Sequence, residues 1–158
     1  MQEILAELTR NEVFRVYVFW SGVLVLKMLF MSVFTGMTRF RTKTFANPED
    51  LVSKKLKVKF GDEDVERIRS KLSLFFYRAH RNDLENILPF FTIGFFYIFT
   101  SPSVYFATQL YRAAAISRLL HTFVYAVVVV PQPARAIAFF VPLAVTGYMA
   151  VSTILYFL

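Results

Sequence analysis

The feature that most constrains the fold of this chain is an apolar run that is too short to cross a bilayer. It covers residues 87–99 and directly follows a polar run, residues 78–86. A spanning helix needs about 20 residues, so part of the polar run has to lie within or against the membrane. Charged groups at that depth are costly and are kept where they pair or line a wet cavity. The junction therefore predicts a ligand site near the start of this helix.

The composition predicts an integral membrane protein. Hydrophobic residues make up 56% of the 158 positions, 19 of them Phe, and the mean hydropathy is +0.50. These values exceed what a small soluble domain needs for its core. We expect a single all-α membrane domain over residues 1–158, built as a four-transmembrane-helix bundle. The expected spans are residues 13–38, 74–99, 104–130 and 136–158, with a loop at about residues 39–72.

The basic residues predict how the chain is oriented. Of its 18 Lys and Arg, 12 lie within residues 39–81, and Arg135 precedes the last span. Because basic loops favour the cytosolic side, we expect the long loop in the cytosol and both termini in the lumen. The net charge of +7 is then a topology signal. A nucleic-acid partner is not expected, since the same loop is also rich in acids and lacks an aromatic stacking platform.

Two kinds of chemistry are excluded by residue type. The chain has no Cys, so it forms no disulfide and supplies no catalytic thiol of its own. Its two His have no clustered partners, so no metal site is expected. The first twelve residues are mostly acidic where charged and lack the basic segment of a cleaved signal peptide. The first span should therefore remain as an anchor.

One polar stripe lies at the start of the second span. Arg78, Asn82 and Glu85 stand at i, i+4 and i+7 and share a helix face, with Arg81 beside them, whereas His80 points elsewhere. The alternative is a solvated first turn with an Arg–Glu surface pair. Because the apolar run is short, we expect Asn82 and Glu85 to lie within the bundle.

A second polar stripe lies on the third span. Arg118, His121 and Tyr125 stand at i, i+3 and i+7. Two facing stripes would enclose a cavity with donors for carboxylates, and with Asn82 and Glu85 as partners for an amide or ammonium group. The alternative for His121, which we favour over a catalytic role, is a core histidine bonded to another helix. Tyr125 also suits a membrane interface.

Two further cations have open roles. Lys27, in the first span, either extends to the interface or pairs with Glu85. Arg135 opens the last span after two prolines, where a cation and a helix N-terminus together suit an anion such as a thiolate. The alternative for Arg135 is a flanking residue that only sets topology, and the residues alone favour it.

Four segments, in this order, resemble the microsomal glutathione transferase subgroup of the MAPEG family, the membrane-associated proteins in eicosanoid and glutathione metabolism. They are Phe45-Ala-Asn-Pro-Glu-Asp50, Arg78-Ala-His-Arg-Asn-Asp-Leu-Glu-Asn-Ile87, His121-Thr122 with Tyr125, and Pro131-Gln-Pro-Ala-Arg135 with Phe139-Phe140. The resemblance covers nearly the whole chain, and four ordered matches are far more specific than one.

The resemblance implies a left-handed four-helix bundle that forms a homotrimer and binds glutathione, without a metal, between subunits near the cytosolic side. It also implies an enzyme of the endoplasmic reticulum or outer mitochondrial membrane, with membrane lipid around it. Such enzymes conjugate glutathione to hydrophobic electrophiles and reduce lipid hydroperoxides. The implied catalytic residues are Arg135, which would stabilise the thiolate, and Tyr125. The implied glutathione contacts are Arg39, Arg78, His80, Asn82, Glu85, Arg118 and Tyr125.

Alternative functions within this resemblance are a non-enzymatic lipid-binding scaffold and a leukotriene-type conjugating enzyme. Arg135 favours an enzyme over the scaffold, because a scaffold needs no thiolate stabiliser. An ion-conducting bundle is a further class, and the second stripe with one acid nearby argues against it.

The chain departs from the family pattern at two places. Leu51 stands where vertebrate members carry a reactive cysteine, so activation through thiol modification is not expected. Residues 70–77 separate Arg69 from Arg78, which the family places together. If this insertion extends the second helix inward, the register from Arg78 onward can survive; if it packs into the bundle, the register cannot survive.

Overall fold

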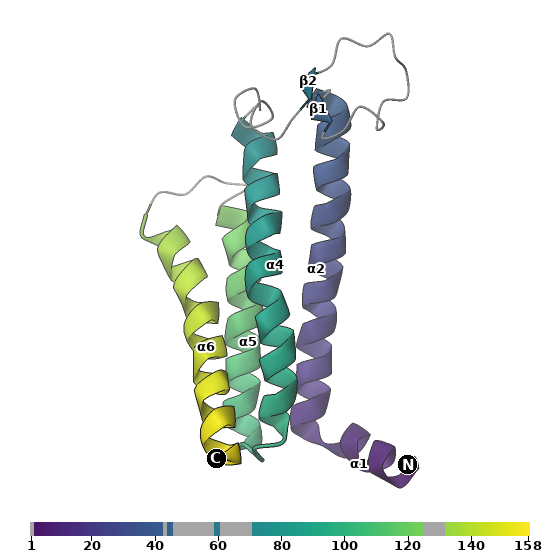
Figure 1. Ribbon diagram of the computed structural model, residues 1–158, viewed down its shortest axis with the longest axis vertical. Coiled ribbons are helices and arrows are strands. Elements are labelled where there is room, and N and C mark those ends of the chain that lie inside the picture. Colours follow the sequence, from purple (N-terminus) through teal and green to yellow (C-terminus); the bar gives the residue numbers. More distant parts are fainter. Residues whose placement is uncertain (1, 43, 46–58, 61–70, 125–131) are drawn as a thin grey trace.

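Four long helices run side by side and make up most of the structure (Figure 1). The computed structural model describes residues 2–42, 44–45, 59–60, 71–124 and 132–158. The long helices are α2 (Glu12–Thr42), α4 (Lys71–Ile98), α5 (Val104–Thr122) and α6 (Ala134–Phe157). Helix α2 packs against α4 and α5, and α6 packs against the same two helices. Consecutive long helices run in opposite directions, so their ends alternate between two poles of the molecule.

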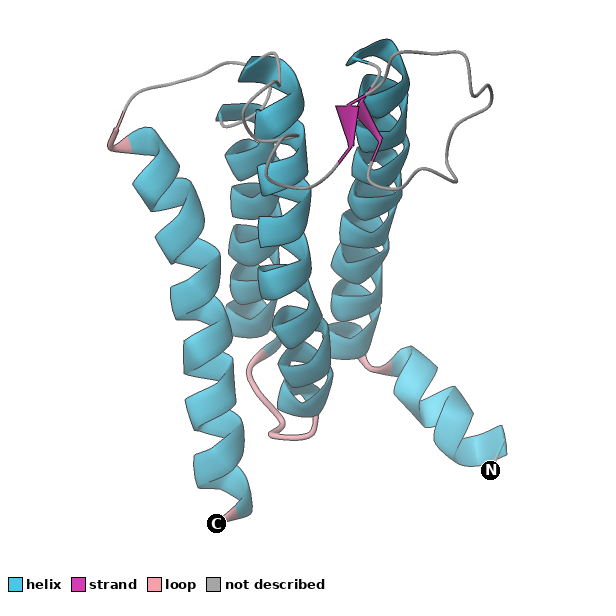
Figure 2. Ribbon diagram, turned by 45° about the horizontal axis from the view of Figure 1, so that its top comes forward, coloured by secondary structure: helices cyan, strands magenta, loops and turns pink. Residues whose placement is uncertain are grey.

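Three short elements complete the fold. Helix α1 (Gln2–Arg10) leaves the lower end of α2 at an angle (Figure 2). At the opposite end, strands β1 (Thr44–Phe45) and β2 (Lys59–Phe60) pair in parallel. None of these three elements was expected from the sequence. The pairing of β1 with β2 brings together the two ends of the segment between them, residues 46–58, which lies outside the described residues.

The helix ends follow local capping rules. The Asn11 side-chain oxygen accepts a hydrogen bond from the Phe14 amide at 3.1 Å, at the start of α2. The Ser103 hydroxyl does the same for the Phe106 amide at 3.2 Å, at the start of α5. Such side chains satisfy amides that have no partner within the first turn of a helix. The link of residues 99–103 is therefore short and defined, and it turns α5 back antiparallel to α4.

The expected spans agree with the helices to within a few residues at most ends. The third helix is the exception, because α5 ends at Thr122, and residues 125–130 of that expected span lie outside the described residues. The inserted segment is helical from Lys71 and continues without a break into Arg78. The inserted residues 71–77 therefore extend the helix, which is the arrangement that allows the register from Arg78 onward to survive. Arg69 and Leu51 lie outside the described residues.

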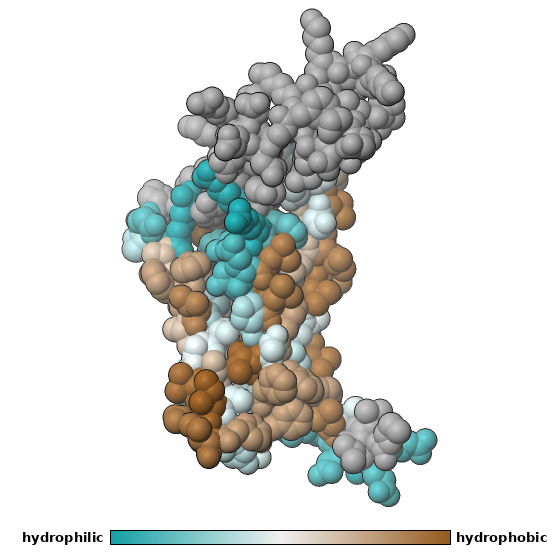
Figure 3. All heavy atoms as spheres, in the orientation of Figure 1, coloured by the Kyte–Doolittle hydropathy of each residue, from teal (hydrophilic) through white to brown (hydrophobic). Residues whose placement is uncertain are grey.

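Two of the long helices have the length and hydropathy of membrane spans. These are Glu12–Thr38, with mean hydropathy 1.9, and Ala134–Phe157, with mean hydropathy 1.8. Only 17% of the apolar window in each is buried, so neither resembles the core helix of a soluble protein. Phe19, Leu26 and Phe30 on α2 are each at least 60% exposed. Figure 3 shows such hydrophobic side chains over much of the helical surface, as expected for a protein solvated by lipid.

Helices α2, α4 and α5 meet around Gly94. The Tyr111 hydroxyl donates to the Gly94 carbonyl oxygen at 2.8 Å, and the Tyr17 hydroxyl donates to the Phe91 carbonyl oxygen at 2.9 Å. The two rings meet edge to face, with centroids 5.6 Å apart. A Cβ at position 94 would lie 3.2 Å from Tyr17 Cε2. Glycine is therefore what lets both rings reach the α4 backbone.

We predict that Gly94→Leu lowers the thermal midpoint of the detergent-solubilised protein. The new side chain would displace the Tyr17 and Tyr111 rings, and overpacking of this kind costs about 1–3 kcal/mol. Gly22→Leu is the matched control, because a Cβ at Gly22 meets nothing within 4 Å. Equal midpoints for the two variants, measured by thermal aggregation, would contradict this account of the contact.

Candidate functional site

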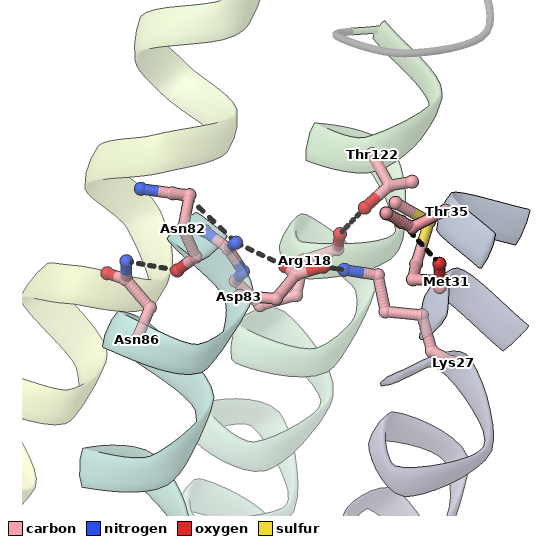
Figure 4. A network of polar contacts seen from close by, with 8 residues as sticks. All are labelled: Lys27, Met31, Thr35, Asn82, Asp83, Asn86, Arg118 and Thr122. Carbon is pink, nitrogen blue, oxygen red and sulfur yellow. Dashed lines mark hydrogen bonds and ion pairs between the residues drawn. The ribbon is translucent and has the colours of Figure 1, made fainter. Parts of the chain in front are cut away.

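Three charged side chains meet in the interior between α2, α4 and α5 (Figure 4). The Asp83 carboxylate accepts hydrogen bonds from Lys27 Nζ through Oδ2 and from Arg118 Nη2 through Oδ1. The exposed fractions of Lys27, Asp83 and Arg118 are 9%, 0% and 2%. We call these three residues the ion triad. Two cations share one anion, so the triad places a surplus positive charge inside the protein.

Each member of the ion triad stands in the buried stripe of its own helix. Asp83 follows Ala79 and precedes Ile87 at four-residue steps, and both neighbours are buried. Lys27 lies between buried Leu24 and Met31 in the same way. Residues three or four apart share one helix face. Packing of these apolar neighbours into the core therefore places the polar side chains in the interior as well.

The sequence interpretation missed Asp83 and gave Lys27 two other roles, extension to the interface or a pair with Glu85. Both roles are wrong, since Lys27 is buried and binds Asp83. The signal was the spacing of Asp83 with Ala79 and Ile87, which puts it in the apolar stripe of the helix, beside the Asn82 stripe. A charge in an apolar stripe needs a partner of opposite sign on a facing helix.

Asn82 connects the ion triad to the outer face of α4. Arg118 Nη2 donates to Asn82 Oδ1 at 2.9 Å as well as to Asp83. The two polar stripes, which the sequence allowed to face each other, do so at this point. Arg118 Nε and Nη1 are buried and have no hydrogen-bond partner among the residues that the structure describes.

Beside Asn82 lies a pocket of about 530 Å³ at the end of the bundle where β1 and β2 lie. We call it the polar pocket. It brings together residues from α4, α5 and the start of α6, including four of the site residues expected from the sequence: Arg78, Asn82, Glu85 and Arg135. Its lining residues are Arg78, Arg81, Asn82, Glu85, His121, Gln132, Arg135, Ala136, Phe139 and Phe140.

The polar pocket is positively charged and has one aromatic edge. Its lining holds three arginines against one glutamate. The Arg81–Glu85 ion pair, at 3.4 Å, is 71% and 59% exposed at its two side chains, so it contributes little to stability. Phe139 and Phe140 stack edge to face on the α6 side, with centroids 5.3 Å apart. The pocket therefore suits an anionic ligand next to an apolar one.

The first turn of α6 supplies more than Arg135. The Gln132 side-chain oxygen accepts a hydrogen bond from the Ala136 amide at 3.2 Å and so satisfies one orphan amide of this helix end. Arg135 lies at the second position of the helix, half-buried, and faces the polar pocket. The expected pairing of a cation with a helix N-terminus is thus present at one wall of the pocket.

The expectation that Glu85 lies within the bundle is wrong for the single subunit, where its side chain is 59% exposed. The reason is the helix start. Because α4 begins at Lys71, the helix is long enough without drawing the whole polar run inward. Asp83 occupies the buried place, and Asn82 is half-buried between it and Glu85.

Four expected glutathione contacts are not among the described residues that line the polar pocket, namely Arg39, His80, Arg118 and Tyr125. Arg118 is buried in the ion triad. His80 is half-buried on the other side of α4, in a hollow of about 260 Å³ that it shares with α2 residues such as Met28. This confirms that His80 points away from the Asn82 stripe. Arg39 lies in α2, but its side chain is outside the described set, as is Tyr125.

The chain matches known proteins over most of its length. The sequence model of the MAPEG family matches residues 17–155. Microsomal glutathione S-transferase 1 of Sus scrofa is 40% identical over 151 residues, which cover 92% of each chain. The human protein of that name is 38% identical over the same coverage. Prostaglandin E synthase of Bos taurus is 38% identical over 120 residues, which cover 75% of this chain and 73% of that protein. With this match and these identities, the chain belongs to the MAPEG family.

Proposed function

We propose that this chain is a glutathione transferase that conjugates glutathione to hydrophobic electrophiles. The observation that carries the proposal is the polar pocket, where Arg78, Asn82 and Glu85 face Arg135 across one cationic hollow. Support also comes from the relatives named microsomal glutathione S-transferase 1, which align with 92% of the chain. The relatives named prostaglandin E synthase align with a smaller part, 75% in the bovine case, so we favour the transferase.

Glutathione carries two carboxylates, one ammonium and one thiol, and the pocket offers a partner for each. Arg78 and Arg81, both in the pocket lining, suit the carboxylates, because a guanidinium forms charge-assisted hydrogen bonds to them. Arg118 does not line the pocket, so it would act through its hydrogen bond to Asn82 and not through direct contact with the ligand. Glu85 suits the ammonium group. Arg39, His80 and Tyr125 remain contacts proposed from the family resemblance. His80 lies across α4 from the polar pocket, so it would reach a glutathione held by a neighbouring subunit.

Arg135 would act on the sulfur. A free thiol has a pKa of about 8.5, and the thiolate is the nucleophile. Lowering that pKa by about two units corresponds to roughly 2.7 kcal/mol of thiolate stabilisation. A nearby guanidinium and the N-terminus of α6 both favour the anion. The thiolate then attacks an electrophilic carbon, a sulfur–carbon bond forms, and the leaving group departs with its electron pair.

The same thiolate would support reduction of lipid hydroperoxides. Two glutathione molecules supply two electrons, so the hydroperoxide becomes an alcohol and water while glutathione becomes its disulfide. Tyr125 would then serve as a second catalytic group. A mass-balanced assay for glutathione disulfide with a lipid hydroperoxide tests this activity, and a conjugating enzyme that forms no disulfide would disprove it.

We further propose that all four long helices cross the membrane, with the polar pocket towards the cytosol. The exposed apolar faces of α2 and α6 support a lipid environment. The membrane would be that of the endoplasmic reticulum or the outer mitochondrial membrane. Apolar electrophiles and lipid hydroperoxides would concentrate in the bilayer and reach the pocket beside Phe139 and Phe140. Protease protection of tagged loops in microsomes tests this orientation.

The first test is glutathione conjugation of a chlorinated dinitrobenzene by purified, detergent-solubilised protein. We expect the wild type to turn over and Arg135→Ala to lose kcat by about tenfold or more, with glutathione still bound, because the thiolate loses its cation. Arg112→Ala is the matched control, since Arg112 is an exposed arginine on α5 outside the polar pocket. Equal kcat values for Arg135→Ala and the wild type would remove the proposed role of Arg135.

Glutathione binding, by contrast, should depend on the α4 stripe. We expect Arg78→Ala and Glu85→Ala each to raise the Kd for glutathione by about tenfold, because each removes a charged partner of the ligand. Equilibrium dialysis with radiolabelled glutathione measures this directly. A Kd unchanged from that of the wild type in both variants would place the ligand elsewhere.

The oligomeric state is a separate expectation. A homotrimer predicts a protein mass near three times the 18.4 kDa of one chain in light scattering, after the detergent contribution is subtracted. His80→Ala then adds a sharper test, because its effect on glutathione binding depends on contact between subunits. A monomeric mass with full conjugation activity would show that one subunit is sufficient.

A further inference from the structure

The chemistry of Arg118 fixes which way the Asn82 amide faces. A guanidinium only donates hydrogen bonds, so the side-chain atom of Asn82 that lies 2.9 Å from Arg118 Nη2 has to be Oδ1. The amide nitrogen then points the other way. Figure 4 shows it directed away from Arg118, towards α6, and Asn82 lines the polar pocket on that side. Asn82 therefore presents N–H donors, and no acceptor, to the pocket.

Arg118 in turn is held by Asp83. Its Nη2 donates to Asp83 and to Asn82, while its Nε and Nη1 donate to no acceptor among the described residues. Asp83 is fully buried and is anchored from a third helix by Lys27. A buried charged pair of this kind has one favourable geometry, because moving either partner would leave the other without compensation. The position of the guanidinium is thus decided by a residue that does not line the pocket.

We propose that Asp83 is a positioning residue that, through Arg118, locks the Asn82 amide so that the polar pocket demands a hydrogen-bond acceptor at that point. The inference rests on the proposed glutathione site. There the acceptor is a carboxylate or peptide carbonyl oxygen of glutathione. Glu85 lies one helical turn further along the same wall, and its carboxylate only accepts hydrogen bonds. The donor Asn82 and the acceptor Glu85 therefore decide which end of the ligand binds at which position along α4.

This assignment changes the role expected for Asn82. The sequence interpretation offered Asn82 and Glu85 alike as partners for an amide or ammonium group. Without Asp83, Arg118 would be free to turn towards the ligand, and the Asn82 amide would be free to flip. A flipped amide would set its oxygen against an oxygen of the ligand. The ion triad therefore acts on recognition without touching the ligand.

The test is a cycle of variants built on Lys27→Met. In the wild type, Asp83→Asn would leave two buried cations, Lys27 and Arg118, without an anion. In the Lys27→Met background the same change leaves only Arg118 without an anion, which lowers the desolvation cost. All four proteins carry Lys27→Met. The first has no other change, the second adds Asp83→Asn, the third adds Asn82→Ala, and the fourth adds both Asp83→Asn and Asn82→Ala. Their Kd values for glutathione are measured by equilibrium dialysis, each relative to Lys27→Met alone.

We expect Asp83→Asn and Asn82→Ala each to raise the Kd by about tenfold, as for loss of one good hydrogen bond to a charged group. The protein with both changes should match the protein with Asn82→Ala, because residues that act through one another are not additive. Multiplication of the two factors would overturn the inference. Tyr111→Phe is the control for destabilisation, since it removes a buried hydrogen bond between α5 and α4 away from the pocket. A similar rise in the Kd of that control would also overturn it.

A second variant leaves Asp83 in place and tests the amide orientation itself. Asn82→Asp keeps one oxygen for Arg118 and turns the other, now an acceptor, into the pocket. We expect it to bind glutathione more weakly than Asn82→Ala, and the reverse order would contradict the assigned orientation. Absence of glutathione binding by the wild type would remove the proposed function and this inference together. Multiplicative losses in a protein that binds glutathione would remove the inference alone.

Discussion

The ion triad of Lys27, Asp83 and Arg118 is the interaction on which the arrangement of this protein depends. Each side chain is at least nine-tenths buried, and each comes from a different long helix. Removal of a charge from water is unfavourable unless an opposite charge and good hydrogen bonds replace the solvent. No two of the three helices can therefore slide or turn against each other without exposing an unpaired charge to an apolar interior. The triad fixes the register of α2, α4 and α5 at the pole that also holds the polar pocket.

Helix α4 divides its polar residues between two tasks. Asp83 faces inward with the apolar stripe, while Arg78, Asn82 and Glu85 face the pocket. Asn82 is the point of contact between the two groups, because its oxygen binds Arg118 and its backbone lies next to Asp83. The inward group adds a surplus positive charge behind a wall that already carries several arginines. The electrostatic field on an anionic ligand would therefore come from both the ion triad and the arginines of the pocket wall. This field is stronger where water is excluded.

The proposed reaction joins a water-soluble peptide to an apolar partner, and the fold offers a surface for each. The polar pocket opens at the basic end of the helices, whereas the rest of α2 and α6 exposes large apolar side chains. Phe139 and Phe140 adjoin Arg135 on the first turns of α6, so an apolar group and a charged group lie at one site. Such closeness matters because the thiolate gains reactivity only if the electrophile is held beside it.

The sequence by itself determined the four long helices, the shared face of Arg78, Asn82 and Glu85, and the family of the chain. Those features follow from local spacing and from the length of apolar runs, which a single helix reveals. Only the tertiary structure decided that Lys27 and Arg118 meet Asp83, that Glu85 stays at the open side of the pocket, and that the inserted residues lengthen α4. Which charged side chains pair depends on how whole helices are rotated and packed against one another. That arrangement minimises the summed desolvation free energy of several buried residues at once. No spacing within one helix carries that information.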